Sequence, residues 1–201
     1  MLSLNIEEAF YNDDKYLSNL AVENDCIRNI DLTGFEFKAI SFDRCQFVDC
    51  NLTKTTFYNC ELINCDLSNC IFTDSYMREV KILNSKCNGT NYSHSHFKQT
   101  RFEHSSFQFA NFSNTVWENC YLENCSMLET FFNESKLKKF IVNVTNFEKA
   151  DFFKTPLKGI DFSSCNIMGI SVSDSFKELS GAKINAGQAI DIVSILGIKI
   201  V

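Results

Sequence analysis

Residues 45–72 read CQFVDCNLTKTTFYNCELINCDLSNCIF, and a phenylalanine or leucine stands at every fifth position from Phe47 to Phe72. The same phase of large, mostly apolar residues runs from Leu32 to Val172. Five residues turn an α-helix by about 140°, so these positions would spread around a helix instead of forming one face. On a flat strand, an odd spacing would send successive phenylalanines to opposite faces. The repeat therefore indicates a chain that turns a corner every five residues, as in a β-solenoid of stacked coils.

A second ladder of small residues accompanies the large one, two positions before it. Residues two apart on an extended chain point to the same side, so each unit should direct one small and one large side chain inward. The other three positions of each unit are mostly polar and should face water. The small inward positions include Cys45, Cys50, Thr55, Cys60, Cys65, Cys70, Ser75, Ser95, Thr100, Ser105, Ala110, Thr115, Cys120, Cys125 and Thr130.

Several of these units resemble a known repeat. Cys65–Asn69, Ala110–Asn114 and Ala150–Lys154 are similar to the A(D/N)LXX motif of pentapeptide-repeat proteins. The resemblance covers residues 25–175. It implies an all-β fold, a right-handed quadrilateral β-helix with four sides and 20 residues per coil.

Six further stretches, from Phe72–Met77 in the middle of the chain to Leu196–Ile200 near its end, carry a narrower resemblance. They are similar to the Qnr proteins of Gram-positive bacteria. It implies a rod-shaped dimer that protects DNA gyrase and topoisomerase IV from fluoroquinolones, with DNA mimicry as a proposed mechanism. Many Qnr proteins of Gram-negative bacteria carry two loops that interrupt the coil. Here the phase does not slip between Leu32 and Val172, so an insertion must be a multiple of five residues or absent, and Ser85–Tyr92 is the weakest stretch. The stretches that carry the resemblance are Phe72–Met77, Ser106–Phe112, Thr155–Ser163, Leu179–Ile184, Gln188–Ile192 and Leu196–Ile200.

Composition restricts the possible partners and the compartment. The formal net charge is −6, which argues against a protein that binds nucleic acid through its phosphates and permits one that presents negative charge to a DNA-binding partner. No apolar run approaches the roughly 18 residues of a membrane span, and the acidic stretch Met1–Glu8 does not resemble a signal peptide. We therefore expect a cytoplasmic protein with no direct contact to nucleic acid or membrane.

Metal, cofactor and catalytic sites are not expected. Eight of the ten cysteines fall on small inward positions, where cysteine serves as a small buried residue, and the CxxC spacing of a zinc site is absent. His94, His96 and His104 are solvent-facing by phase. The sequence contains no Gly-rich phosphate loop, no GxSxG and no HExxH motif. We expect no enzymatic activity, no cofactor and free cysteines.

Charge can be sorted by side once a 20-residue coil is adopted. The side centred on Phe37 and Phe57 sums to a positive charge, whereas the other three sides are acidic. Two explanations account for this distribution equally well. One is chance scatter of a few charges per side, and the other is imitation of a DNA backbone by the acidic sides. The carboxylates that we expect to face a topoisomerase lie on the sides centred on Phe42 and Phe47: Asp43, Glu61, Glu103, Glu123, Asp161, Asp49, Asp66 and Glu129.

The two ends depart from the repeat. The phase persists weakly at Leu17, Val22 and Ile27, so we expect an irregular first coil and cap over residues 1–25. We expect the regular β-helix over 26–175 and a dimerisation segment over 176–201. Asn185 and Gln188 predict a capping box for a helix from Ala186 to Leu196 that ends at Gly197, followed by a short strand at Ile198–Ile200. A helix that merely caps its own coil is the alternative. The residues predicted for the dimer contact are Ala189, Ile190, Val193, Leu196, Ile198 and Ile200.

Two functions therefore remain open from the sequence. The first is a homodimeric protein that binds DNA gyrase and topoisomerase IV and counters fluoroquinolones. The second is an interaction scaffold with no role at topoisomerases, which any pentapeptide solenoid could be. The C-terminal helix and strand favour the first function, because a generic repeat does not require that tail.

Overall fold

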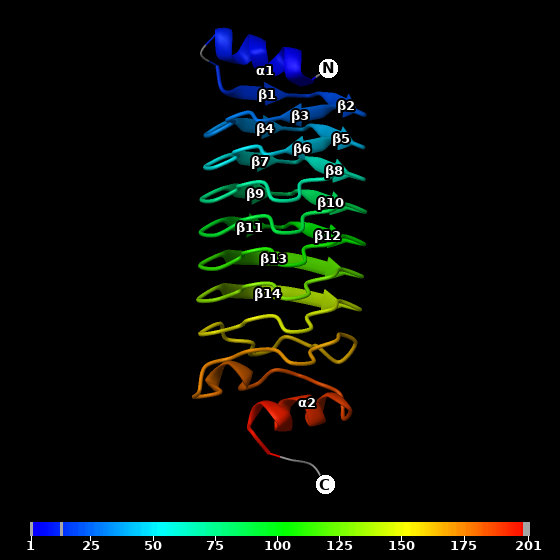
Figure 1. Cartoon of the computed structure of the whole chain (residues 1–201), viewed down its shortest axis with the longest axis vertical. Coiled ribbons are helices and arrows are strands. Elements are labelled where there is room, and N and C mark those ends of the chain that lie inside the picture. Colours follow the sequence, from blue (N-terminus) through cyan, green and yellow to red (C-terminus); the bar gives the residue numbers. More distant parts are fainter. Residues whose placement is uncertain (1, 13, 199–201) are drawn as a thin grey trace.

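The computed structural model describes residues 2–12 and 14–198, which wind into a right-handed β-helix (Figure 1). Helix α1 (Leu2–Tyr11) lies at one end of the rod and helix α2 (Gln188–Ile195) lies at the other. All strand pairs are parallel and join residues 20 positions apart, for example Phe37 with Phe57. Four five-residue units therefore complete one turn, as the sequence predicts.

The four sides of the coil, which we call A, B, C and D in chain order, differ in regularity. Side A and side B carry continuous ladders of short strands, and β13 and β14 run from one onto the other. Side C begins with two strands, and both side C and side D otherwise consist of single parallel bridges, such as Asn91 with Asn111. The strands are β1 (Tyr16–Ser18), β4 (Glu36–Lys38), β7 (Thr56–Tyr58), β9 (Tyr76–Arg78) and β11 (His96–Lys98) on side A; β2 (Ala21–Glu23), β5 (Ser41–Asp43), β8 (Glu61–Ile63), β10 (Lys81–Leu83) and β12 (Arg101–Glu103) on side B; β3 (Cys26–Arg28) and β6 (Gln46–Val48) on side C; and β13 (Val116–Glu123) and β14 (Lys136–Asn143) across sides A and B.

The corners are made by a left-handed backbone conformation at nearly every fifth residue. From Asn19 to Gly159 these residues have φ between +45° and +84°. Most side chains are strained in this conformation, and Asn, Asp and Gly tolerate it best. Asn is accordingly the residue found most often there, at ten positions. This repeated corner is the physical origin of the five-residue period.

Val144 is the corner residue least suited to its backbone, and we predict that Val144→Asn stabilises the fold. Its φ is +45°, which is a rare outlier for a β-branched side chain, and the side chain is 55% exposed, so little packing is lost. We expect the free energy of unfolding to rise by about 1 kcal/mol. Asn124 occupies the same corner one coil earlier, so Asn124→Val should lower stability by a similar amount. Urea unfolding of both variants measures the two effects, and equal stability of all three proteins would contradict this account of the corner.

The large inward residues stack in register to form the core. On side D, the rings of Phe72, Tyr92, Phe112, Phe132 and Phe152 form a continuous column with neighbouring centroids 5.0–5.2 Å apart. On side A, the Phe97 ring stacks on the Trp117 ring at 4.3 Å. The rings are essentially inaccessible to solvent. Burial of this apolar area from coil to coil supplies the main driving force for folding.

The small inward residues satisfy backbone groups at the corners. The Ser95 hydroxyl accepts the backbone N–H of Ser75 at 3.0 Å and donates to the carbonyl of Phe72 at 2.7 Å. Cysteine makes the same donations as serine: Cys65 Sγ contacts the carbonyls of Phe42 and Ile63 at 3.4 and 3.3 Å. Because buried backbone groups require partners, serine, threonine and cysteine are favoured at this position, although apolar residues such as Phe35, Val80 and Phe140 also occupy it.

The N-terminal part differs from the expectation. The first coil begins at Tyr16, ten residues before the boundary expected at residue 26, and the cap that precedes it is a helix. Leu17, Val22 and Ile27 already occupy buried inward positions. Leu17, Val22 and Ile27 therefore belong to a complete coil, in which the outward residues do not follow the motif. No helix among residues 2–12 and 14–198 is long and apolar enough to span a membrane.

The rest of the rod follows the predicted phase. The 20-residue register continues through Lys86, Ser106 and Asn91, so no loop interrupts the coil at Ser85–Tyr92. Gly89 forms the corner there with φ +67°, and an added Cβ would lie 2.4 Å from Asn69 Oδ1, so any larger residue would require the Asn69 side chain to move.

The C-terminal helix forms close to its predicted place. The Gln188 backbone N–H donates to Asn185 Oδ1 at 3.0 Å, and the Asn185 backbone N–H donates to Gln188 Oε1 at 2.8 Å. This confirms the capping box, although regular helix begins at Gln188 rather than Ala186. Gly197 follows the helix with φ +74°, as expected of a helix C-terminus. The predicted strand at Ile198–Ile200 falls largely on residues 199–201, outside the described residues.

Candidate partner-binding surfaces

Nine of the ten cysteines are buried, and Cys26 is exposed. Burial raises the pKa of the Cys60, Cys120 and Cys125 thiols to about 11, so these groups are protonated at neutral pH. Within residues 2–12 and 14–198, no three His, Cys, Asp or Glu side chains are gathered as a metal site would require. The outer surfaces are therefore where a function can be sought.

The carboxylates expected on side B are mostly paired inside the chain. Asp43 contacts Arg44 at 2.8 Å, Glu61 contacts Lys81 at 2.8 Å, and Glu103 contacts Arg101 at 2.8 Å. Glu123 accepts the Tyr121 hydroxyl at 2.9 Å. Asp161 accepts the backbone N–H of Ser163, and its hydrogen bonds to Ser163 lower its pKa. In the described part of the chain, neither Glu123 nor Asp161 forms an ion pair, although the charge of Lys183 also lowers the pKa of Asp161.

The carboxylates expected on side C show the same division. Glu129 contacts Lys149 at 3.4 Å, whereas Asp66 accepts the backbone N–H of Ser68. Asp49 is an exposed corner residue without an ion pair among the described residues. Side B and side C share a corner. Of the eight predicted carboxylates on these two sides, Asp49, Asp66, Glu123 and Asp161 have no ion pair among the described residues. The paired cations lie on the same sides and are already counted in the sequence sums, so the ion pairs change which carboxylates are free but not the net charge of these sides.

Side A is basic, as its sequence predicts. Its cations contact other side chains in the N-terminal half of the rod and are mostly unpaired in the C-terminal half. In its N-terminal half, Lys38 and Arg78 lie over the Tyr58 ring, 6.0 and 5.2 Å from its centroid, and Arg78 also contacts Glu79. In its C-terminal half, Lys136, Lys138, Lys139 and Lys158 are exposed, and among the described residues only Lys138 has an ion-pair partner, Glu118 at 3.7 Å. The unpaired positive charge of side A is thus concentrated toward the C-terminal end.

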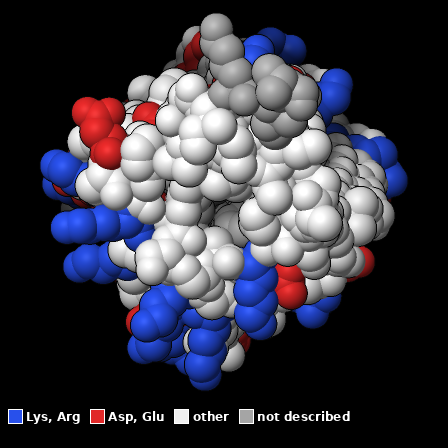
Figure 2. Space-filling view, turned by 90° about the horizontal axis from the view of Figure 1, so that it is seen from below, with Lys and Arg blue, Asp and Glu red and all other residues white. Residues whose placement is uncertain are grey.

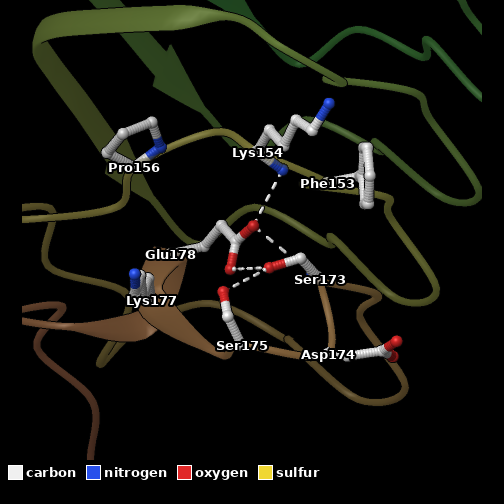
Figure 3. A pocket seen from close by; sticks show the side chains of 8 residues that line it. All are labelled: Phe153, Lys154, Pro156, Ser173, Asp174, Ser175, Lys177 and Glu178. Carbon is white, nitrogen blue, oxygen red and sulfur yellow. Dashed lines mark hydrogen bonds between the residues drawn. The ribbon is translucent and has the colours of Figure 1, made fainter.

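Two side chains close the last coil of the rod. The Glu178 carboxylate, from the 3₁₀ helix Lys177–Leu179, accepts the backbone N–H of Lys154 at 2.8 Å and both the N–H and hydroxyl of Ser173 (Figure 3). The Gln188 side-chain amide donates to the carbonyls of Phe162 and Cys165 at 2.8 and 2.6 Å. These groups would otherwise face a further coil that does not exist, so both side chains cap an open edge.

The Glu178 cap predicts a specific dependence of stability on pH. Burial of the carboxylate would raise its pKa, but the hydrogen bonds from the Ser173 hydroxyl and the backbone N–H groups outweigh burial and lower the pKa. A group whose pKa is lower in the folded state stabilises above its unfolded pKa, and this stabilisation is lost as the pH falls. Wild type should therefore exceed Glu178→Gln in free energy of unfolding at pH 7, and the difference should shrink below about pH 4. A difference that stays constant between pH 7 and pH 3 would contradict a charged cap.

Helix α2 packs one face against the last coil and leaves its other face exposed. Ile192 and Ile195 pack toward the core, and Gln188 is buried against the coil. Of the predicted dimer residues, Ala189, Ile190, Leu196 and Ile198 are exposed and Val193 is half-buried, whereas Ile200 lies outside the described residues. Figure 2 looks onto this end of the rod, where uncharged surface covers most of the face and lysine and arginine side chains gather on the rim. The arrangement caps the chain's own coil and leaves apolar surface uncovered.

A hollow of about 510 Å³ lies beside the Glu178 cap, at the edge between sides D and A (Figure 3). It forms where the repeat stops after Val172 and the 3₁₀ helix replaces the next unit. Its lining residues are Phe153, Lys154, Pro156, Ser173, Asp174, Ser175, Lys177 and Glu178.

Comparison with known proteins agrees with this architecture. The family model of the pentapeptide repeat region matches residues 55–132. No curated protein matches the chain. Two structures of trypsin-treated QnrB1 variants, a plasmid-mediated fluoroquinolone resistance protein, are similar at 19% identity. One has a TM-score of 0.53, with 92% of this chain and 99% of that chain covered. The other has a TM-score of 0.50, with 92% and 98% covered.

A weaker likeness is to HetL, a pentapeptide repeat protein involved in heterocyst differentiation regulation from the cyanobacterium Nostoc sp. strain PCC 7120. The identity is 12%, the coverage is 89% of this chain and 92% of that chain, and the TM-score is 0.34.

Proposed function

Because the chain is a pentapeptide-repeat protein with the fold of the fluoroquinolone resistance protein QnrB1, we propose that it binds DNA gyrase and topoisomerase IV and protects them from fluoroquinolones. The observation that carries the proposal is this fold match, which covers 92% of the chain, in a rod whose lysine, arginine and most acidic side chains lie on the outer sides. Because side chains fill the core, a partner would contact the sides or the ends of the rod. We place the protein in the cytoplasm, together with these enzymes, and assign it no catalytic activity of its own.

Imitation of DNA, in this proposal, depends on a few positions and not on overall charge density. Duplex DNA carries one negative charge per roughly 1.7 Å of its axis, whereas the coils of a β-helix repeat every ~4.8 Å. Ion pairs neutralise Asp43, Glu61, Glu103 and Glu129. Of the eight predicted carboxylates, Asp49, Asp66, Glu123 and Asp161 are left for cations of a DNA-binding enzyme.

Expression of the chain in a susceptible bacterium should raise the inhibitory concentration of a fluoroquinolone severalfold. The double variant Asp49→Lys with Glu123→Lys reverses two unpaired carboxylates and should remove most of that protection. Both positions point outward, and lysine already occupies the same type of corner as Asp49 at Lys54 and Lys149, so the fold should be retained. Glu36→Lys with Asp74→Lys changes the net charge equally on sides A and D and serves as the control.

Equal loss of protection in both double variants would contradict a role for sides B and C. Absence of any protection by the wild-type chain, together with normal expression, would favour the interaction scaffold without a topoisomerase role.

We also propose that the protein works as a homodimer joined through its C-terminal ends. The support is the uncovered apolar side of α2, where Ile190 is 56% exposed, together with the uncharged face around it (Figure 2). A two-fold pairing would place the same surface of both copies in contact, which is the commonest oligomer symmetry. Such a dimer doubles the length of the rod and presents two equivalent sets of sides to a symmetric enzyme.

A further inference from the structure

We propose that residues 156–198, which we call the cap body, are hinged to the rod along sides C and D and open at a seam on sides A and B. The seam is the boundary between residues 136–144 of the rod and residues 156–164 of the cap body. The hinge lies within one chain, so it would exist whether or not the chain binds a topoisomerase.

The backbone ladder of sides A and B stops at β14. In the described chain β14 pairs with β13 and with no later strand, although β13 pairs on both of its edges. In earlier coils of side A, the residue after the small inward position donates its N–H to the preceding coil, as Thr56 does to the Phe35 carbonyl at 2.9 Å. The equivalent residue at the seam is Pro156, which has no N–H to donate.

Within the described residues, no backbone hydrogen bond crosses the seam. The Val144 N–H donates to the Ser164 hydroxyl at 3.2 Å in place of a carbonyl. Leu157 and Phe162 of the cap body are nevertheless buried, whereas Leu137 on the rod is partly exposed. Sides A and B are therefore joined mainly by apolar packing, which has no preferred direction and tolerates a change of tilt.

Sides C and D continue without interruption past the same coil. Parallel bridges join Asn146 with Asn166 and Asp151 with Ser171. Five backbone hydrogen bonds of 2.7–3.1 Å also join the rod to the cap body there, with the N–H donor named first: Phe147 to Asn166, Lys149 to Met168, Phe152 to Ser171, Asn166 to Thr145 and Ser171 to Ala150. These two sides would act as the hinge, and the opening would be widest at the opposite corner, between sides A and B.

The cap body is held together by hydrogen bonds of its own. Its sides A and B pair with the segment that follows them, and Asp161 forms a parallel bridge with Lys183. The backbone bonds, at 2.8–2.9 Å and with the N–H donor named first, run from Leu157 to Glu178, Gly159 to Gly181, Phe162 to Lys183 and Lys183 to Ile160. The Gln188 amide adds its two donations to the same coil. The cap body can therefore tilt as one unit.

Lysines gather on both lips of the seam on side A. They are Lys136, Lys138 and Lys139 on β14 and Lys158 in the cap body. Lys138 and Lys158 occupy the same position in successive coils, where like charges repel each other. Glu118, 3.7 Å from Lys138, belongs to the rod and does not bridge the seam. The repulsion therefore favours opening on the side that lacks hydrogen bonds.

In the proposed dimer the two cap bodies would form the junction between the rods, so the hinge would set the angle between them. This consequence rests on the dimer, whereas the hinge itself does not. A chain that proves to be a monomer would leave the hinge unaffected.

Pulsed electron paramagnetic resonance with pairs of nitroxide spin labels tests the hinge in the full chain. The background is Cys26→Ser, because Cys26 is the exposed cysteine. Lys98→Cys with Lys177→Cys places labels on either side of the seam, and Lys38→Cys with Lys138→Cys places them within the rod. An excess of unlabelled chain keeps distances between two copies out of the signal. We expect a broad or two-peaked distance distribution across the seam and a single narrow peak within the rod.

Two independent substitutions should close the seam. Pro156→Thr restores an N–H donor at the position that Thr56 occupies, and Lys158→Glu places a carboxylate opposite Lys138. Each should narrow the distribution across the seam toward that of the rod. Lys54→Glu changes the charge equally at a corner far from the seam and is the control, which should leave the distribution broad.

Equal widths for the two label pairs in the background protein would overturn the hinge. A distribution across the seam that stays broad in both closing variants would also overturn it, in favour of general fraying of the C-terminal end. Hydrogen exchange separates these two cases independently. A hinge leaves the amides of Leu157 and Phe162, which are bonded inside the cap body, as protected as those of Phe147 and Phe152, whereas fraying exposes all four.

Discussion

Replacement of Phe112 by aspartate should leave the chain unable to fold. Phe112 is fully buried and lies in the middle of the side D column, with its ring centroid 5.0 Å from that of Tyr92 and 5.2 Å from that of Phe132. Loss of a buried phenylalanine costs about 3–5 kcal/mol, and an unpaired buried carboxylate adds several kcal/mol more. The sum approaches the whole stability of a typical domain, about 5–15 kcal/mol.

The neighbouring substitution Asn111→Asp is the matched control and should be nearly neutral. Asn111 points outward, and its Oδ1 accepts the backbone N–H of Ser113 at 2.9 Å. Asp151 makes the equivalent bond to Phe153 two coils later, so aspartate fits this position. Circular dichroism and size-exclusion chromatography should show a folded rod for Asn111→Asp and aggregated or unfolded chain for Phe112→Asp. A folded Phe112→Asp would contradict the stacked core.

Ile190→Asp combined with Leu196→Asp should convert the proposed dimer into a folded monomer. Both side chains lie on the uncovered surface of α2 and its C-terminus, where they are 56% and 43% exposed, so their replacement should leave the rod intact. Light scattering should give wild type a mass near twice 23.0 kDa and the variant a mass near 23.0 kDa. Ile141→Asp is the control, because Ile141 is equally exposed but lies on side B, and this variant should remain a dimer.

Point substitutions test the dimer more cleanly than removal of residues 186–201. That truncation would delete Gln188 and leave the carbonyls of Phe162 and Cys165 without their donor. The exposed edge of the last coil would then promote aggregation, whether or not the wild-type chain forms a dimer. A wild-type chain that is a monomer at micromolar concentration would contradict the dimer.

The repeat made the interior predictable from the sequence. A single period of five, present from Leu32 onward, determines which residues point inward, and the stacked rings of Phe72 to Phe152 follow from it directly. The capping box of Asn185 and Gln188 was also readable, because its pattern is local. The first coil was predicted only as an irregular one, since Leu17, Val22 and Ile27 keep the phase while the residues around them do not resemble the motif.

The surface was less predictable, because side charges were summed without regard to their position along the rod. Glu61 with Lys81, Glu129 with Lys149, and Glu134 with Lys154 are ion pairs between residues 20 apart. This spacing was a signal present in the sequence once the coil length was known. The Glu178 cap and the hollow beside it carried no such signal, since they arise where the repeat ends and the chain leaves the periodic path.

The most direct test of the account is a DNA gyrase supercoiling assay with ciprofloxacin, with and without the purified chain. We predict that the protein restores supercoiling in the presence of the drug in a dose-dependent manner, and that Asp49→Lys with Glu123→Lys restores it far less. Supercoiling that stays inhibited at every concentration of folded wild-type protein would contradict protection of gyrase.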